Sequence, residues 1–486
     1  MSIAARSASE ERSDRGSEQR ASRALLVVDG DLVTMAPDRA VLERTTVAVV
    51  DGAIAALGPA AELRAQFPGA TEIDAAGCVV TPGLVDAHQH TTGDPLVRST
   101  IPDDIDSQQS IFDWAVPIHA AHEPADDELA ATLTAVEALT NGVTTIAEPG
   151  TVAAPLSVAR GLSAAGIRGR VGTWGWDAPG LPWSGPAAEV LARQEQLLAD
   201  LPPDGLVGAW VTLVGHDLAS DALFAGAAAL AERADTQVTW HLSPSTDDGL
   251  AYAARSGKRP VTHLADLGVL GPRLVLGHAV HLDDDELGAL LDTGTAIAVC
   301  PGAYLRLGQG YTGASRHAEF LRSGGRLALG CDSHNAGDTP DVLRAAWLLA
   351  GVSRDTAAGD PPLTAADAFA VATCAGAEAL GLGDLVGSIE VGKRADLVVF
   401  DGTAPAWTPR GDLALHLVWG APSGTVRDVL VDGRPVVRDG RVTTVDLAAL
   451  REEATARRAS LLRRAGIDPV PSWPVRPALV PGGTPA

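Results

Sequence analysis

Lysine and cysteine are both scarce in this chain. Its 486 residues contain only two lysines, Lys258 and Lys393, and only four cysteines, none in a CxxC pair. The cysteines lie far apart in apolar runs, which favours reduced, buried thiols in a cytoplasmic protein over a disulfide framework. No run of about 18 apolar residues is present, so no membrane span is predicted. The cysteines are Cys78, Cys300, Cys331 and Cys374.

Positive charge is also in short supply. The formal net charge is -24, which argues against nucleic acid and anionic membranes as partners. An acidic surface mostly serves solubility, so it does not by itself imply a cationic substrate. Residues 1–22 are rich in Arg, Ser, Glu and Asp and have no apolar core for a signal peptide. We therefore expect a disordered arm and a cytoplasmic location.

Short strands with Asp-Gly turns are present near both ends of the chain. Residues 23–82 and residues 388–446 each read as a set of such strands. Two β-rich pieces this far apart can form one small β-sandwich if the chain between them is an inserted domain with adjacent ends. Residues 447–486 are expected to form a C-terminal helix and a proline-rich tail.

Residues 83–387 alternate between apolar strands and helical stretches. Eight strand–helix repeats in roughly 300 residues predict an α/β fold of the (β/α)8 TIM-barrel type. In such barrels the chemistry sits at the carboxyl ends of the strands. The expected strand ends are Asp86, Ala147, Thr173, Val214, His241, His278, Cys300 and Cys331.

Histidines and one aspartate cluster at these predicted strand ends. His88 and His90 are two residues apart after the first strand, so both side chains point to the same side of the sheet. His241, His278 and Asp332 follow the fifth, sixth and eighth strands. Three or four imidazoles with one carboxylate predict a site for one divalent metal ion with room for water. Zn²⁺ is the first expectation, and Fe²⁺ or Mn²⁺ also suits these ligands.

Several motifs resemble those of the amidohydrolase superfamily over nearly the whole chain, most of all the group of triazine chlorohydrolase, guanine deaminase and adenosylhomocysteine deaminase. The resemblance implies that His88, His90, His241 and Asp332 bind the metal. It also implies that His278 hydrogen-bonds the substrate or the metal's water. The motifs are Pro82–His90, Asn141–Thr145, Gly257–His278, Gly330–Ser333 and Gly387–Leu397.

A mononuclear hydrolase is the reading that this resemblance favours. Binuclear relatives use a carboxylated lysine on strand four, and residues 206–214 contain no lysine. A metal-activated water, with Asp332 as base and His278 as donor, would cleave a C–N bond, or another C–X bond, of a small cyclic or heterocyclic substrate. We also expect a homodimer or a higher homo-oligomer.

Pro244 departs from the family pattern. Deaminating members usually carry a proton-shuttling glutamate three residues after the strand-five histidine, and proline cannot transfer a proton. Asp332 alone could move the proton, or Glu148 or Asp247 could substitute. Alternatively, the protein is a metal-dependent lyase, isomerase or cyclase of a specialised pathway. Asp247 and Asp248 are read as solvent-facing residues at a helix start.

Aromatic and polar residues near the strand ends are the candidate substrate contacts. Trp174 and Trp176 follow strand three in a chain that is only 4% aromatic, and could form a stacking wall. The full set of expected contacts is His216, Trp174, Trp176, Gln108, Trp114, Glu148 and Asn335.

Overall fold

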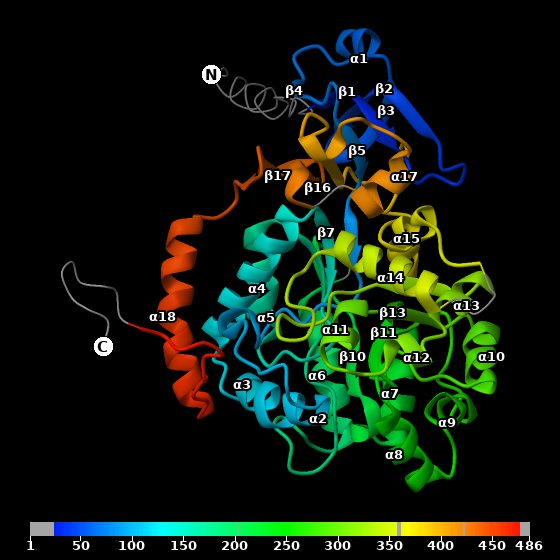
Figure 1. Ribbon diagram of the computed structural model, residues 1–486, viewed down its shortest axis with the longest axis vertical. Coiled ribbons are helices and arrows are strands. Elements are labelled where there is room, and N and C mark those ends of the chain that lie inside the picture. Colours follow the sequence, from blue (N-terminus) through cyan, green and yellow to red (C-terminus); the bar gives the residue numbers. More distant parts are fainter. Residues whose placement is uncertain (1–23, 203, 357–360, 421–422, 477–486) are drawn as a thin grey trace, which may run out of the picture.

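The computed structural model describes residues 24–202, 204–356, 361–420 and 423–476. The expected arm at residues 1–22 and the last ten residues of the expected tail lie outside the described residues. Figure 1 shows a small β-sheet at one end of the molecule and a larger barrel below it. Within the described part of the chain, no helix is both long and apolar enough to cross a membrane.

The small sheet combines strands from both ends of the chain, as expected. It is one continuous nine-stranded sheet, in which β5 pairs antiparallel with β15. Alternate side chains of its strands, among them Val27, Val49 and Leu430, form a core of their own. The strands are β1 (Ala24–Val33), β2 (Val41–Val50), β3 (Ala53–Gly58), β4 (Thr71–Asp74), β5 (Val79–Pro82), β15 (Leu397–Phe400), β16 (Val426–Val431), β17 (Arg434–Arg438) and β18 (Arg441–Val442).

The predicted barrel is confirmed. Strand four is divided at Trp210 into β9, which pairs with β8, and β10, which pairs with β11. Backbone hydrogen bonds close the barrel between its first and last strands, including Ala87 N to Leu329 O at 2.8 Å. The strands are β6 (Leu84–Asp86), β7 (Val143–Ala147), β8 (Arg168–Val171), β9 (Val207–Ala209), β10 (Val211–Gly215), β11 (Val238–Leu242), β12 (Leu274–His278), β13 (Ala296–Val299) and β14 (Arg326–Leu329).

Helices surround the barrel and cover the outer faces of its strands (Figure 1), so most strand positions are buried. The main ones are α4 (Pro124–Thr140), α5 (Pro155–Ala165), α6 (Ala187–Asp200), α7 (Asp221–Arg233), α8 (Thr246–Ser256), α9 (Pro260–Asp266), α10 (Asp284–Thr293), α13 (His317–Arg322), α14 (Val342–Thr356) and α15 (Ala365–Val371).

Shorter helices lie in the loops of the barrel and in the connections between strands of the small sheet. They include α1 (Ala60–Gln66), α2 (Ser107–Gln109), α3 (Val116–Ala120), α11 (Pro301–Arg306), α12 (Tyr311–Ala314), α16 (Cys374–Ala379) and α17 (Leu413–Leu415). The helix expected near the C-terminus is α18 (Leu447–Ala465), which lies beside α4 in Figure 1. Leu461 and Leu462 of α18 pack against Leu129 of α4.

Candidate metal centre

His88 is the most isolated polar side chain of the site. Its ring is fully buried, and neither of its nitrogens has a hydrogen-bond partner among the described residues. Glycines at the carboxyl ends of β12 and β14 make room for it, because a Cβ at Gly277 would lie 2.7 Å from the His88 ring and one at Gly330 2.6 Å from the His88 Cβ. Two unpaired nitrogens in a buried site are costly unless they bind something.

His241 and His90 bring two more ring nitrogens to the same place. Their Nε2 atoms are 3.2 Å apart. Nδ1 of His241 lies 2.7 Å from the carbonyl oxygen of Val214, to which it can only donate, so Nε2 of the neutral ring carries a free lone pair. Burial lowers the pKa of His241 to about 3 and that of His90 well below its usual range, so both rings are neutral.

Asp332 supplies the carboxylate. Its Oδ1 is 3.4 Å from Nε2 of His90, and its backbone N–H donates to the His88 carbonyl at 2.8 Å. Burial, reinforced by the charge of Asp94, raises the pKa of Asp332 to about 7. Asp332 is also in the left-handed region, with φ of +65°. The free lone pairs, neutral rings and one carboxylate fit a single divalent cation with nitrogen and oxygen ligands.

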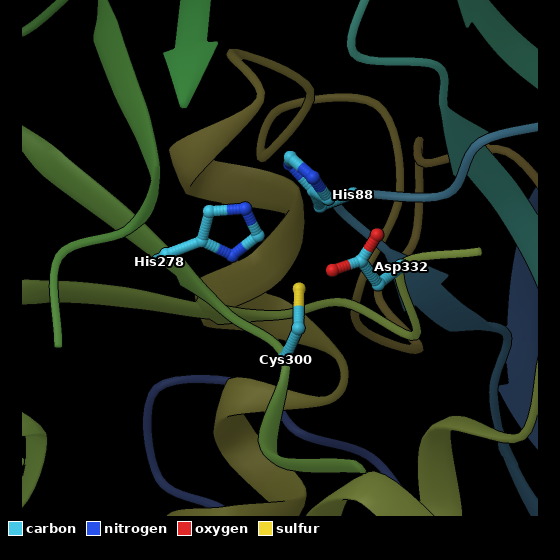
Figure 2. Close-up of side chains that lie close together, drawn as sticks. All are labelled: His88, His278, Cys300 and Asp332. Atoms are coloured by element: carbon cyan, nitrogen blue, oxygen red, sulfur yellow. The ribbon is translucent and has the colours of Figure 1, made fainter. Parts of the chain in front are cut away.

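His278 and Cys300 form a second group of candidate ligands with His88 and Asp332. Figure 2 shows His88, His278, Cys300 and Asp332 turned toward one space, and each offers an atom within 4.8 Å of the others. Burial raises the pKa of the Cys300 thiol well above its usual range, which keeps the sulfur protonated. The sequence indicated Cys300 only as a buried thiol at a strand end.

Tyr304 holds the far nitrogen of His278. The Tyr304 hydroxyl accepts a hydrogen bond from the Cys300 N–H at 2.7 Å and lies 3.3 Å from Nδ1 of His278. If the hydroxyl proton is donated to Nδ1, the proton of the neutral imidazole is on Nε2. In that tautomer His278 is a hydrogen-bond donor rather than a metal ligand.

A cavity of about 350 Å³ opens over these residues, a size that suits a small organic ligand. Five of the expected substrate contacts line it, together with His90, His241, His278 and Asp332 at its polar end. Those five are His216, Trp174, Trp176, Gln108 and Asn335. Sequence reasoning did not single out Asp94 or His119, which also line it.

Trp114 and Glu148 were also expected as substrate contacts, but neither lines the cavity. Trp114 lies in a π-helical turn, Ser110–Ala115, whose winding turns Ile111, Phe112 and Ala115 to the cavity instead. Glu148 is fully buried, and its carboxylate accepts hydrogen bonds from the backbone N–H groups of Gly150 and Thr151 at 2.9 and 3.1 Å.

Glu148 is linked to the metal centre through Thr151. The Thr151 hydroxyl lies 3.3 Å from the Glu148 carboxylate and 2.6 Å from Nδ1 of His90. A hydroxyl that donates to the carboxylate can accept the Nδ1 proton of His90, which leaves Nε2 of His90 free. Glu148 therefore orients a candidate ligand instead of touching the substrate.

Asp248 is the residue near Pro244 that the sequence interpretation misplaced. It is buried rather than solvent-facing, and its carboxylate lies 2.9 Å from Nδ1 of His216. It also accepts a hydrogen bond from the Ser243 N–H at 2.5 Å. Burial alone would lower the pKa of His216, but the charge and the hydrogen bond of Asp248, together with the charge of Asp332, outweigh burial and raise that pKa. Pro244 lines the same cavity as this pair.

Comparisons with known proteins agree with this architecture. Residues 79–436 match the model of the amidohydrolase family, and residues 47–70 match a bacterial imidazolonepropionase-like composite domain. A protein of Syntrophobacter fumaroxidans named 5-methylthioadenosine/S-adenosylhomocysteine deaminase is 31% identical, over 88% of this chain and 96% of its own length.

Two solved structures have the same fold. An adenosine deaminase of Xanthomonas campestris with bound zinc is 29% identical with a TM-score of 0.85, covering 90% of this chain and 98% of its own. The zinc complex of atrazine chlorohydrolase from Arthrobacter aurescens is 23% identical with a TM-score of 0.82, covering 89% and 100%. Because the family match spans most of the sequence and a relative above 30% identity covers nearly nine-tenths of it, this chain belongs to the amidohydrolase family.

Proposed function

We propose that this protein is a hydrolase with one zinc ion that removes an amino group from a ring carbon of a small heterocyclic substrate. The observation that carries the proposal is a buried set of candidate ligands beside a ligand-sized cavity. His88, His90 and His241 form one group, and His88 and Asp332 belong to an overlapping group. A relative named as a deaminase and a similar structure with bound zinc support both the reaction and the metal.

His88, His90, His241 and Asp332 would hold the metal. Once bound, the ion would acidify a water molecule, lowering the pKa of that water from 15.7 toward roughly 7. The donor set of three histidines and one carboxylate suits Zn²⁺ and also accommodates Fe²⁺ or Mn²⁺. Zinc is the better proposal because the similar adenosine deaminase and atrazine chlorohydrolase structures contain it.

Proton transfer and charge stabilisation would fall to Asp332 and His278. Asp332 would accept the proton of the attacking water as general base. His278, with Nδ1 held by the Tyr304 hydroxyl, would donate from Nε2 to the polar atom of the substrate on which negative charge develops.

His216 and Asp248 offer a second proton carrier beside Pro244. Proline has no acidic proton to give, and Asp247, one of the two carboxylates suggested by the sequence, is exposed and bonded to Gln108 and Ser245. The other, Glu148, lies outside the cavity. His216 lies in the cavity wall, 5.5 Å from His241 between ring centroids, with its other nitrogen bonded to Asp248. This pair supports deamination without the usual glutamate.

Ammonia release tests the proposal. Zinc-loaded protein is incubated with adenosine, 5′-methylthioadenosine, guanine and an aminotriazine in ¹⁸O-water. We expect one ammonia released per substrate consumed and one ¹⁸O at the former amino position. Asp332→Asn, which replaces the carboxylate with a carboxamide of the same shape, should remove the reaction, while zinc content is measured separately.

The rival reading is a metal-dependent lyase, isomerase or cyclase, and Pro244 is the residue that favours it. Such an enzyme would convert its substrate completely without ¹⁸O in the product and without ammonia. That result, with zinc bound stoichiometrically, would contradict the proposed hydrolysis.

We also propose a cytoplasmic location and a homodimer. The four cysteines are unpaired, and three of them are buried, which suits a reducing compartment. Trp347 and Trp419 form an exposed edge-to-face pair 5.9 Å apart, an apolar feature that a second subunit could cover. Light scattering after size exclusion tests the dimer, and Trp347→Glu should dissociate it.

A further inference from the structure

Carboxylates and histidines are the ionisable side chains found in the cavity lining. Among the described residues, neither a lysine nor an arginine lines it. The absence matters because a substrate carboxylate or phosphate is normally paired with a guanidinium or an ammonium group. Five aspartates line the same surface: Asp94, Asp217, Asp247, Asp248 and Asp332.

We propose that the substrate bears no anionic group and is an uncharged or cationic amino-heterocycle with an apolar substituent. This inference rests on the proposed deamination and names the substrate class of the same site. The metal's charge would act at the reacting end, beside Asp332. The rest of the cavity would meet the substituent of the ring.

Arginines near the cavity are bonded elsewhere. Arg193 donates to the backbone carbonyls of Trp174 and Trp183 at 3.4 and 2.9 Å. Arg306 donates to the carbonyl of Ile101 at 3.1 Å. Arg255 pairs with Asp217, with 2.9 Å between nitrogen and oxygen. Each guanidinium thus supports a wall residue, and none of the three lines the cavity.

Asp247 leaves the mouth of the cavity negatively charged. Its exposed carboxylate accepts hydrogen bonds from two neutral groups, the Gln108 amide at 3.3 Å and the Ser245 hydroxyl at 3.1 Å. Asp217 is paired with Arg255 and Asp248 with His216, whereas Asp247 has only these neutral partners in the described contacts. An anionic substituent placed here would be repelled and would lose hydration without a counter-charge.

The remaining wall is apolar. Trp174 and Trp176 are buried, with ring centroids 4.7 Å apart. Ile111, Phe112 and Leu218 line the cavity with them. These surfaces gain free energy by covering an apolar substituent, and aromatic faces also attract a cation.

Three adenosine analogues test the charge preference on the zinc-loaded protein. They carry a 5′-methylthio group, a 5′-amino group or a 5′-carboxymethylthio group, which is neutral, cationic or anionic. We expect kcat/KM for ammonia release to be at least 100-fold lower for the anionic analogue than for the methylthio analogue, with the cationic analogue within about tenfold. Equal values for the neutral and anionic analogues would overturn the inference.

A charge-reversal pair of variants separates the local effect from net charge. Asp247→Arg should lower the ratio of kcat/KM for the neutral analogue to kcat/KM for the anionic analogue at least tenfold. Asp285→Arg makes the same change in net charge at an exposed position of α10 outside the cavity, and should leave the ratio unchanged. An unchanged ratio in Asp247→Arg, or an equal narrowing in Asp285→Arg, would contradict the assignment.

Binding measured by calorimetry distinguishes this inference from the proposed reaction. If the analogues bind but none releases ammonia, the deamination is refuted, and the affinities alone decide the charge preference. Tighter binding of the neutral than of the anionic analogue would then support it, and equal binding would refute it.

Discussion

Buried polar groups at the two ends of the barrel differ in whether they have hydrogen-bond partners. At the carboxyl ends of the strands, both nitrogens of His88 lack hydrogen-bond partners among the described residues. At the amino end of β8, Arg168 makes two hydrogen bonds to Asp396, at 2.9 and 3.0 Å, with side chains only 5% and 1% exposed. Asp396 in turn accepts from the backbone N–H of Asp432 at 2.7 Å. Unpaired groups thus gather where a ligand is expected, and paired charges lie where the barrel meets the small sheet.

This difference teaches that burial alone does not reveal a role. Both regions contain ionisable groups removed from water, which is costly in either place. Only the region whose buried polar atoms lack hydrogen-bond partners can still use those atoms to bind a ligand. Substitutions in the two regions should therefore separate activity from stability.

His241→Ala should have the largest effect on activity. Removing one proposed ligand is expected to lower kcat/KM about 10⁴-fold, or about 5.5 kcal/mol of barrier, with loss of bound zinc. Zinc analysis and ammonia release check this.

The control for that variant is His263→Ala, which alters a histidine of α9 that pairs with Asp221. It should retain its zinc. Full zinc content and activity in His241→Ala would exclude this residue from the centre.

Asp396→Ala should have the largest effect on stability. Leaving Arg168 buried without its partner is expected to cost about 3–5 kcal/mol in the free energy of unfolding. The kcat/KM of the folded fraction should change little, because the pair is remote from the cavity. Urea unfolding followed by assay checks both. Asp235→Asn, at a carboxylate 89% exposed, should lose much less of the free energy of unfolding. Equal losses of stability in Asp396→Ala and Asp235→Asn would contradict the special role of the buried pair.

Glu148→Gln should change how stability depends on pH. Burial raises the pKa of Glu148 from 4.5 to about 7. Between these values the folded state holds a proton that the unfolded state has lost, so the stability contributed by this residue falls as pH rises. The full loss is about 3 kcal/mol above pH 7. Since glutamine does not titrate, the free energy of unfolding of the variant should rise relative to that of the parent between pH 5 and pH 8. Urea unfolding measures this, and the same pH dependence in both proteins would refute the shifted pKa.

Tyr304→Phe should have the smallest of these effects. Loss of the hydroxyl beside Nδ1 of His278 is expected to lower kcat about tenfold, or about 1.4 kcal/mol, with KM and zinc content nearly unchanged. Tyr311→Phe, at a buried ring 5.1 Å from Tyr304 between centroids, is the matched control. A change in KM without a change in kcat, or an equal fall in kcat in both variants, would argue against a positioning role for Tyr304.

The fold could be predicted from the sequence because strand and helix patterns repeat and strand ends are marked by polar residues. His88 and His90 follow directly from their spacing after β6. Contacts between distant loops could not be predicted in this way. Asp248 meets His216 across 32 positions and Tyr304 meets His278 across 26. No local pattern encodes either contact.

Glu148 shows a second limit. A strand end predicts that a residue lies near the rim of the barrel but not which way its side chain turns. At Glu148 the backbone N–H groups of its own loop compete for the carboxylate and turn it away from the cavity.

The pairing of β5 with β15 also sets an order of events during synthesis. Residues 79–82 cannot complete this pairing until residues 397–400, which follow roughly 300 positions later, have been synthesised. At typical translation rates of about 5–20 residues per second, that delay is about 15–60 s. Throughout it, the edge of β5 that β15 will later cover is open to any other strand. Expression conditions that slow translation or crowd nascent chains should therefore increase misassembly at this edge.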